Sequence, residues 1–124
     1  NAIQFLSKKI KSYPEKYDAR RCTLYLGNII RMQEEIGTGG GGFRFLYAAF
    51  LEQASNYVNN EQLLKISDEF TKAGDLWRAS AVNMGRIYKG RLNEQKDFEE
   101  SANMLNEIAA IERAAFKELR KIKL

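Results

Sequence analysis

The chain has 124 residues, a net charge of +4 and a pI of about 9.2, and it is 44% hydrophobic and 29% charged. This length suits one domain with a buried core, and the balance excludes a disordered chain. A single cysteine excludes an internal disulfide framework, and no apolar run approaches the roughly 20 residues that span a bilayer. The basic residues form small clusters without interleaved aromatic residues, so we expect a cytoplasmic protein with neither a nucleic-acid nor a membrane partner.

The beginning of the chain predicts a short helix. Asn1-Ala2 is typical of the remnant of a cleaved expression tag, so we read residues 3–124 as a single helical domain and as the C-terminal part of a longer protein. Apolar residues recur at helical spacing over residues 3–13. Pro14 is expected to end this helix or to kink its path.

A second helix is expected to begin near Asp18, a favourable N-cap residue, and to end at Gly37. After it, five of the nine glycines fall within residues 37–42. The following stretch, residues 42–58, is apolar around most of its circumference, which is typical of a buried helix. We therefore expect residues 42–58 to be the central helix, against which the others pack.

Two more helices complete the prediction. Asn59 and Gln62 fit a capping box that opens a helix ending near Tyr88. Trp77 is expected to pack in the core with its N–H on an acceptor, and Gly74 to let another helix approach. A last helical pattern runs from residue 97 to the end. The sequence thus predicts an all-α fold, a bundle of about five helices around a buried central helix preceded by a glycine-rich loop.

The residues offer little catalytic chemistry. The chain has no histidine, which removes Ser-His-Asp and Cys-His systems and most zinc sites from this chain taken alone. Cys22 lies on the apolar face of its helix and is expected to be a buried small hydrophobe. Glu107 and Glu112 lie near the apolar stripe of the last helix, where we expect partial burial. We predict no catalytic residue, no metal site and no cofactor.

The glycine-rich stretch matches the pattern G-x-G-x-x-G at Gly37, Gly39 and Gly42, but no strand precedes it, and it also lacks the Gly-Lys-[Ser/Thr] continuation of a P-loop. One interpretation is a glycine loop at a helix N-terminus, where free N–H groups and Arg44 suit an anion. The other is that the glycines let two helices pack closely while Arg44 pairs with a neighbouring carboxylate. The candidate ligand or interface residues are Gly37, Thr38, Gly39, Gly40, Gly41, Gly42, Arg44 and Tyr47.

The run from Ile36 to Ala54, with its glycines followed by Phe43-Arg44-Phe45-Leu46-Tyr47, resembles the C-terminal domain of the butirosin biosynthesis protein H family. The stretch from Ala73 to Arg78, which contains Trp77, is similar to that domain's second landmark. In the family, an N-terminal papain-like domain carries the cysteine and histidine of an acyltransferase of antibiotic biosynthesis. The resemblance implies a helical accessory domain and transfers no catalytic residue to this chain.

The function expected from this resemblance is a non-catalytic helical domain of an acyltransferase-type protein of specialised metabolism. Its glycine-rich loop would help to form the substrate or domain interface. The implied partners are an N-terminal catalytic domain of the same protein and an acyl carrier protein or its phosphopantetheine arm. The alternative is a structural or oligomerisation module without a ligand, with a second copy of the chain as its partner.

Overall fold

The computed structural model describes residues 2–35, 40–90 and 95–123. Over those residues the chain forms five α-helices, one short 3-10 turn and no strand. The elements are α1 (Ala2–Lys16), α2 (Ala19–Glu34), η1 (Gly41–Phe43), α3 (Arg44–Val58), α4 (Glu61–Tyr88) and α5 (Gln95–Arg120). The prediction of an all-α bundle of about five helices is confirmed. None of the helices in these ranges is long and apolar enough to cross a lipid bilayer.

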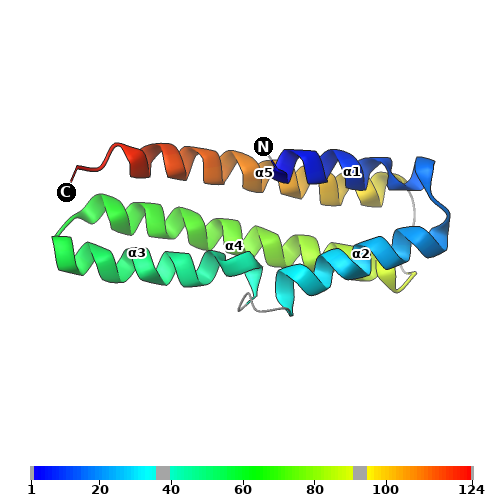
Figure 1. Cartoon of the computed structure of the whole chain (residues 1–124), viewed down its shortest axis with the longest axis horizontal. Helices are drawn as coiled ribbons and strands as arrows, with labels where there is room; N and C mark the ends of the chain where they lie inside the picture. The colour runs from blue at the N-terminus through cyan, green and yellow to red at the C-terminus, as the bar shows by residue number, and fades with distance from the viewer. Residues whose placement is uncertain (1, 36–39, 91–94, 124) are drawn as a thin grey trace.

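Two long antiparallel helices, α4 and α5, run the length of the molecule (Figure 1). Helices α2 and α3 lie end to end along α4, and α1 lies along the N-terminal half of α5. The molecule therefore has two unlike halves. We call α1, α2 and the adjoining parts of α4 and α5 the four-helix half. We call α3 and the remaining parts of α4 and α5 the three-helix half.

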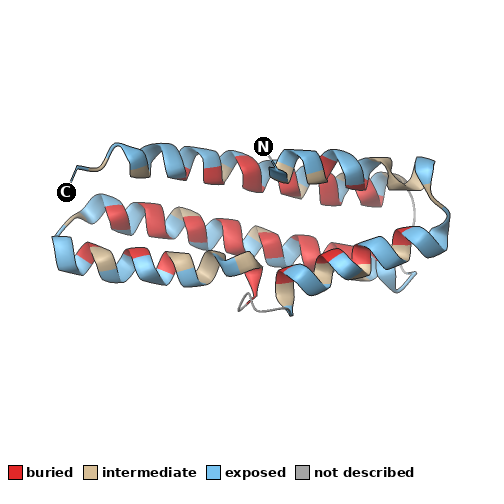
Figure 2. Cartoon of the chain, in the orientation of Figure 1, coloured by how far each residue is buried: buried red, intermediate tan, exposed pale blue. Residues whose placement is uncertain are grey.

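Each half has its own apolar core, because each helix turns its buried residues toward the bundle axis (Figure 2). The core of the four-helix half includes Ile10, Leu26, Met84, Leu105 and Ile108, all fully buried. The core of the three-helix half includes Leu51, Leu63, Ile66, Phe70 and Ala115. The long helices thus contribute to both cores and join the halves into one body.

The central helix of the bundle is α4, which packs against α2, α3 and α5. The backbone of α3 approaches only α4 and η1 within the described ranges. Leu46, Phe50 and Tyr57 of α3 are 59%, 60% and 92% exposed. The prediction that residues 42–58 form the buried central helix is therefore wrong. Apolar residues on one flank of α3 are largely exposed in the part of the chain that the structure describes.

The helix ends follow local chemistry. The Asp18 carboxylate accepts a hydrogen bond from the backbone N–H of Arg21 at 2.8 Å, which confirms it as the N-cap of α2. Pro14 does not end its helix, because α1 continues through it to Lys16. Asn60, rather than Asn59, caps α4. The expected end of the second helix at Gly37 lies outside the described residues.

Candidate functional site

The described part of the glycine-rich stretch makes a left-handed turn into α3. Gly40, Gly41, Gly42 and Phe43 all have positive φ, at 82°, 58°, 56° and 71°. Glycine adopts these angles readily, whereas a residue with a side chain pays about 1 kcal/mol or more. The backbone of this turn therefore explains why glycine stands at positions 40–42, and it places strain on Phe43.

Contacts with α2 and α4 hold the turn in place. The backbone N–H of Gly41 donates to both carboxylate oxygens of Glu34 at 3.3 Å. Glu34 Oε2 also lies 3.8 Å from Nε of Arg78, whose guanidinium lies 5.1 Å from the centre of the Phe45 ring. A Cβ on Gly74 would lie 2.8 Å from that ring. The prediction that Gly74 permits a close approach is confirmed, and the group that approaches is Phe45.

Arg44, the first residue of α3, is held by an acidic residue of α5. Its Nε and Nη2 donate to the Glu112 carboxylate at 3.0 and 2.9 Å, and its Nη1 donates to the Gly42 carbonyl at 2.6 Å. The guanidinium also lies 4.7 Å from the centre of the Trp77 ring. The Trp77 N–H in turn donates to Glu112 Oε2 at 3.1 Å, as the sequence predicts for a core tryptophan. This bidentate network joins α3, α4 and α5 at one point.

The chain's own carboxylates therefore occupy the donors of the turn. Glu112 pairs with Arg44, and Glu34 accepts from the Gly41 backbone. This is the pairing expected from the packing interpretation of the glycine-rich stretch. Arg44 is nevertheless still 25% exposed through its side chain, and it borders a groove on the surface.

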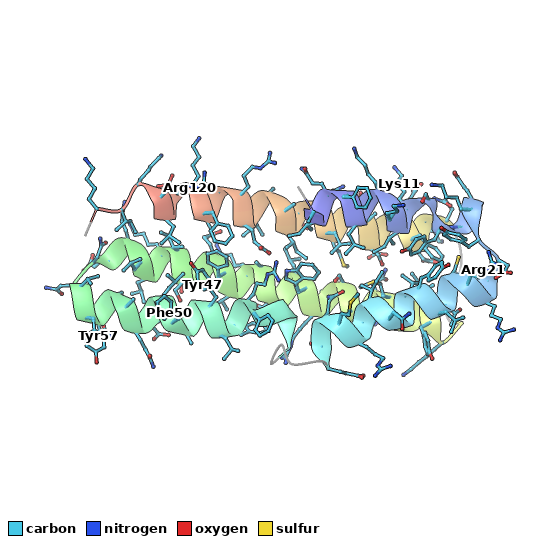
Figure 3. All side chains as sticks on the ribbon, in the orientation of Figure 1. Lys11, Arg21, Tyr47, Phe50, Tyr57 and Arg120 are labelled. Carbon is cyan, nitrogen blue, oxygen red and sulfur yellow. The ribbon has the colours of Figure 1, made fainter. Side chains whose placement is uncertain are left out.

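The groove lies between α3 and α5 and has a volume of about 350 Å³. The ring of Phe70 on α4 lies 4.8 Å from Tyr47 on α3 and 5.0 Å from Phe116 on α5, measured between ring centres. Phe43 lines one end, and Phe50 stacks against Tyr47 at 6.1 Å. Figure 3 labels Tyr47 and Phe50 on α3 and Arg120 on α5. We call the surface formed by these five aromatic residues the aromatic groove.

The candidate residues from the sequence fall into two groups. Gly40, Gly41, Gly42, Arg44 and Tyr47 lie together at the turn and the aromatic groove. Gly37, Thr38 and Gly39 lie outside the described residues. Phe70 and Phe116, which line the groove from α4 and α5, are not among the residues predicted from the sequence. Their helical spacing marks them only as apolar, so no local signal separates them from ordinary core residues.

Cys22 is buried, as predicted. Its thiol donates to the Tyr13 carbonyl, with Sγ and oxygen 3.4 Å apart. Burial raises the pKa of this thiol above its ordinary value of 9.0, and the negative charge of Asp18 raises it further. Such a thiol is a poor nucleophile near neutral pH. Within the described ranges, no group of three or more histidine, cysteine or acidic residues is placed to hold a metal ion.

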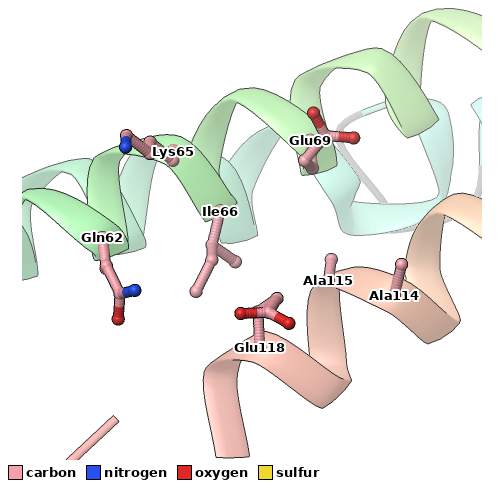
Figure 4. Close-up of a pocket in the computed structure, with 7 residues that line it drawn as sticks. All are labelled: Gln62, Lys65, Ile66, Glu69, Ala114, Ala115 and Glu118. Atoms are coloured by element: carbon pink, nitrogen blue, oxygen red, sulfur yellow. The ribbon is translucent and has the colours of Figure 1, made fainter. Parts of the chain in front are cut away.

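A second depression, of about 310 Å³, lies between α4 and α5 (Figure 4). Its floor is Ile66 and Ala115, and its edge carries the carboxylates of Glu69 and Glu118. Glu69 pairs with Lys72 one turn further along α4 at 2.9 Å, and Glu118 pairs with Lys121, the residue after the end of α5, at 3.1 Å. This depression therefore has the character of a solvated helix–helix boundary rather than a binding site.

The sequence model of a family described as "Domain of unknown function (DUF4872)" matches residues 1–119. Searches of the curated proteins and of the solved structures gave no significant match.

Proposed function

Because the chain belongs to the family described as Domain of unknown function (DUF4872), we propose that it is the non-catalytic helical domain of a larger acyltransferase-type protein. The larger protein would be similar to butirosin biosynthesis protein H and act in the cytoplasm, in specialised metabolism. The resemblance of the run from Ile36 to Ala54 supports this assignment. Catalysis would be carried by a cysteine and a histidine outside this chain, since the chain has no histidine.

The observation that carries the proposal is the exposed apolar flank of α3 beside the glycine turn. Leu46, Phe50 and Tyr57 lie at helical spacing on a single flank of α3, Phe43 directly precedes this helix, and each of the four is more than half exposed. Contiguous apolar surface of this kind marks a contact with another protein surface. In the proposal this flank and the turn form the interface with the catalytic domain.

The glycine turn and Arg44 would then shape the interface. Glu34 and Glu112 fix the turn and the first residue of α3, so the aromatic side chains are presented from a rigid backbone. A rigid surface loses less conformational entropy on binding than a flexible loop. An acyl carrier protein, or its phosphopantetheine arm, would approach the edge of this interface near Arg44.

Cross-linking in the full-length protein tests the proposal. A photoreactive amino acid at position 46 is expected to form cross-links to the catalytic domain, because Leu46 is 59% exposed and belongs to this flank. The control places the same amino acid at position 24, where the native residue is an exposed leucine of α2, and this variant should form no cross-links to the catalytic domain. A gene that encodes no cysteine- and histidine-containing domain upstream, or cross-links that are equal at both positions, would refute the proposal.

The alternative, a structural or oligomerisation module, is supported by the same exposed flank, since a second copy of the chain would also bury it. Sedimentation of the chain separates the two functions. A dimer that dissociates when Phe50 is replaced by serine would favour the module, and a monomer at all concentrations would favour the accessory domain.

A further inference from the structure

The three-helix half lacks a counterpart to α1 in the part of the chain that the structure describes. In the four-helix half, α1 lies along α5 and faces α2, which completes a four-helix bundle. In the other half, α3 takes the place of α2 along α4, and no described helix lies where α1 would continue (Figure 1). The open position borders the aromatic groove.

The surface of α5 shows the same change from one half to the other. Ala102, Ala109 and Phe116 stand seven residues apart and therefore lie on one face of α5. Ala102 is buried beneath α1, where its carbonyl accepts a hydrogen bond from Ser7 at 2.7 Å, and Ala109 is 1% exposed. Phe116, beyond the start of α1, is 43% exposed. One apolar face thus continues past the helix that covers it.

The open position is continuous along the molecule. A hollow beside the first turn of α1 is lined by Ile3 of α1 and by Glu112 and Phe116 of α5. The aromatic groove is lined by the same Glu112 and Phe116. The two hollows therefore adjoin at these side chains, and we call the two together the track, which begins beside the first turn of α1.

The rim of the track along α5 is basic. Arg113, Lys117 and Arg120 line the hollow, and all three are exposed. None of them has a carboxylate partner among the described residues. On the α3 side, Tyr47 lines the groove, and Phe50, which is 60% exposed, stacks against it. An occupant that matches both rims needs an apolar face and carboxylates on the side toward α5.

We propose that the three-helix half binds an acidic amphipathic α-helix of the partner, in the position that α1 occupies in the other half. The apolar face of this helix lies on Tyr47, Phe50 and Phe116, and its carboxylates face the basic rim. This inference deepens the proposed function, on which it rests for the existence of a partner surface. A membrane surface is less suited to the track, because the track is concave with Phe70 at its floor, whereas a bilayer requires a convex apolar face.

Two synthetic helical peptides test the proposal on the chain itself. Both have the 15-residue length of α1 and the same leucine and alanine stripe, and they carry either glutamate or lysine on their flanks. Fluorescence anisotropy is expected to show that the acidic peptide binds at least about tenfold more tightly than the basic one. Replacing Arg113, Lys117 and Arg120 together by glutamate should reverse this order.

Matched variants control for charge and for folding. Lys8, Lys9 and Lys11 on α1 are also exposed, and replacing them by glutamate makes the same change in net charge. That variant should bind the acidic peptide within about threefold of the parent chain, a change that corresponds to weak long-range electrostatics. Phe50→Ser should lose binding of the acidic peptide, whereas Leu24→Ser, at an exposed leucine of α2, should keep it. Circular dichroism confirms that each variant is helical.

Several results would overturn the proposal. Binding of neither peptide, equal binding of both, or equal losses in the α1 and α5 charge variants would exclude a helix-binding track. A dimer abolished by Phe50→Ser would assign the track to a second copy. Binding of the chain to phosphatidylserine vesicles that is lost in Phe50→Ser would show that the track binds a membrane surface. If neither peptide binds while the photoreactive amino acid at position 46 still forms cross-links to the catalytic domain, the proposed function stands and only the helix-binding inference is refuted.

Discussion

Glu112 is a single buried carboxylate that satisfies donors from two other helices. Its oxygens accept from Nε and Nη2 of Arg44 and from the N–H of Trp77. Glu112 is only 6% exposed, so water does not readily replace it. Removing one partner of such a pair is costly because the other charge stays behind without compensation. The partial burial predicted for Glu107 is wrong, because Glu107 is exposed on the outer face of α5.

We expect Glu112→Ala to lower the free energy of unfolding by about 3 kcal/mol, since Arg44 and Trp77 both lose their acceptor. Glu112→Gln keeps one acceptor oxygen and should cost less. Urea unfolding monitored by circular dichroism measures both. Glu118→Ala, which removes the exposed partner of Lys121, is the control and should change stability by at most about 0.5 kcal/mol. Equal effects at positions 112 and 118 would contradict the network described above.

Cys22 and Tyr13 make a second residue-level prediction, which concerns pH. Burial raises the pKa of both side chains above their ordinary values of 9.0 and 10.0. The unfolded chain therefore releases these protons at a lower pH than the folded chain. Their contribution to stability is complete below about pH 9 and is lost as the pH rises through the folded pKa values.

The free energy of unfolding should accordingly fall above pH 9, and it should fall less steeply in Cys22→Ala than in the parent chain. Urea titrations at a series of pH values from 7 to about 11 measure the two slopes. Between pH 7 and 8 the two curves should run parallel, which controls for the loss of packing. Parallel curves throughout would show that the thiol titrates normally in the folded chain.

At the level of the elements, two glycines of α4 differ in what surrounds them. A Cβ on Gly74 would lie 2.8 Å from the Phe45 ring, whereas a Cβ on Gly85 would have no neighbour within 4 Å. Gly85→Ala should therefore stabilise the chain by up to about 1 kcal/mol through helix propensity. Gly74→Ala should destabilise it by about 1–3 kcal/mol, because the ring that holds the turn must move. Thermal unfolding of both variants checks the opposite signs.

Local patterns predicted the type of every helix better than its place in the bundle. The spacing of apolar residues in α4 and the N-cap at Asp18 depend on near neighbours in the chain, and both predictions are confirmed. The all-round apolar pattern of α3 was read as burial within this chain. The same pattern is produced when one flank packs on α4 and the other remains exposed, and periodicity alone does not distinguish these cases.

The candidate site was predictable only in part, for a similar reason. The glycines and Arg44 stand out in the sequence because their composition is unusual. Glu112 lies 68 positions from Arg44, and only the antiparallel return of α5 brings the two together. The sequence could therefore predict that Arg44 pairs with a carboxylate, whereas only the folded structure shows that this carboxylate belongs to Glu112.

On the scale of the whole molecule, the two halves should differ in local stability. The four-helix half surrounds its core on all sides, while the three-helix half leaves the aromatic groove open. Local opening is easier where fewer apolar contacts must break. Amide hydrogen exchange should therefore be faster in α3 than in the C-terminal half of α4, although both segments are helical.

The acidic peptide described above should slow exchange in α3 and leave the C-terminal half of α4 unchanged. The basic peptide is the control and should alter neither segment. Equal exchange rates over the whole bundle in the free chain would show that the open groove does not lower the local stability of the three-helix half.

The position of α1 has one more consequence. Its first turn lies at the mouth of the track, beside Glu112 and Phe116. A segment joined to the chain ahead of Ala2 would emerge there and reach the track without diffusing to it. Short tethers give effective concentrations of about 1 mM, so a tethered helix with an intrinsic dissociation constant near that value would be bound about half of the time. Weak recognition would therefore be enough for an attached segment to fill the fourth position of the bundle, whereas a free peptide would have to be present at about 1 mM to reach the same occupancy.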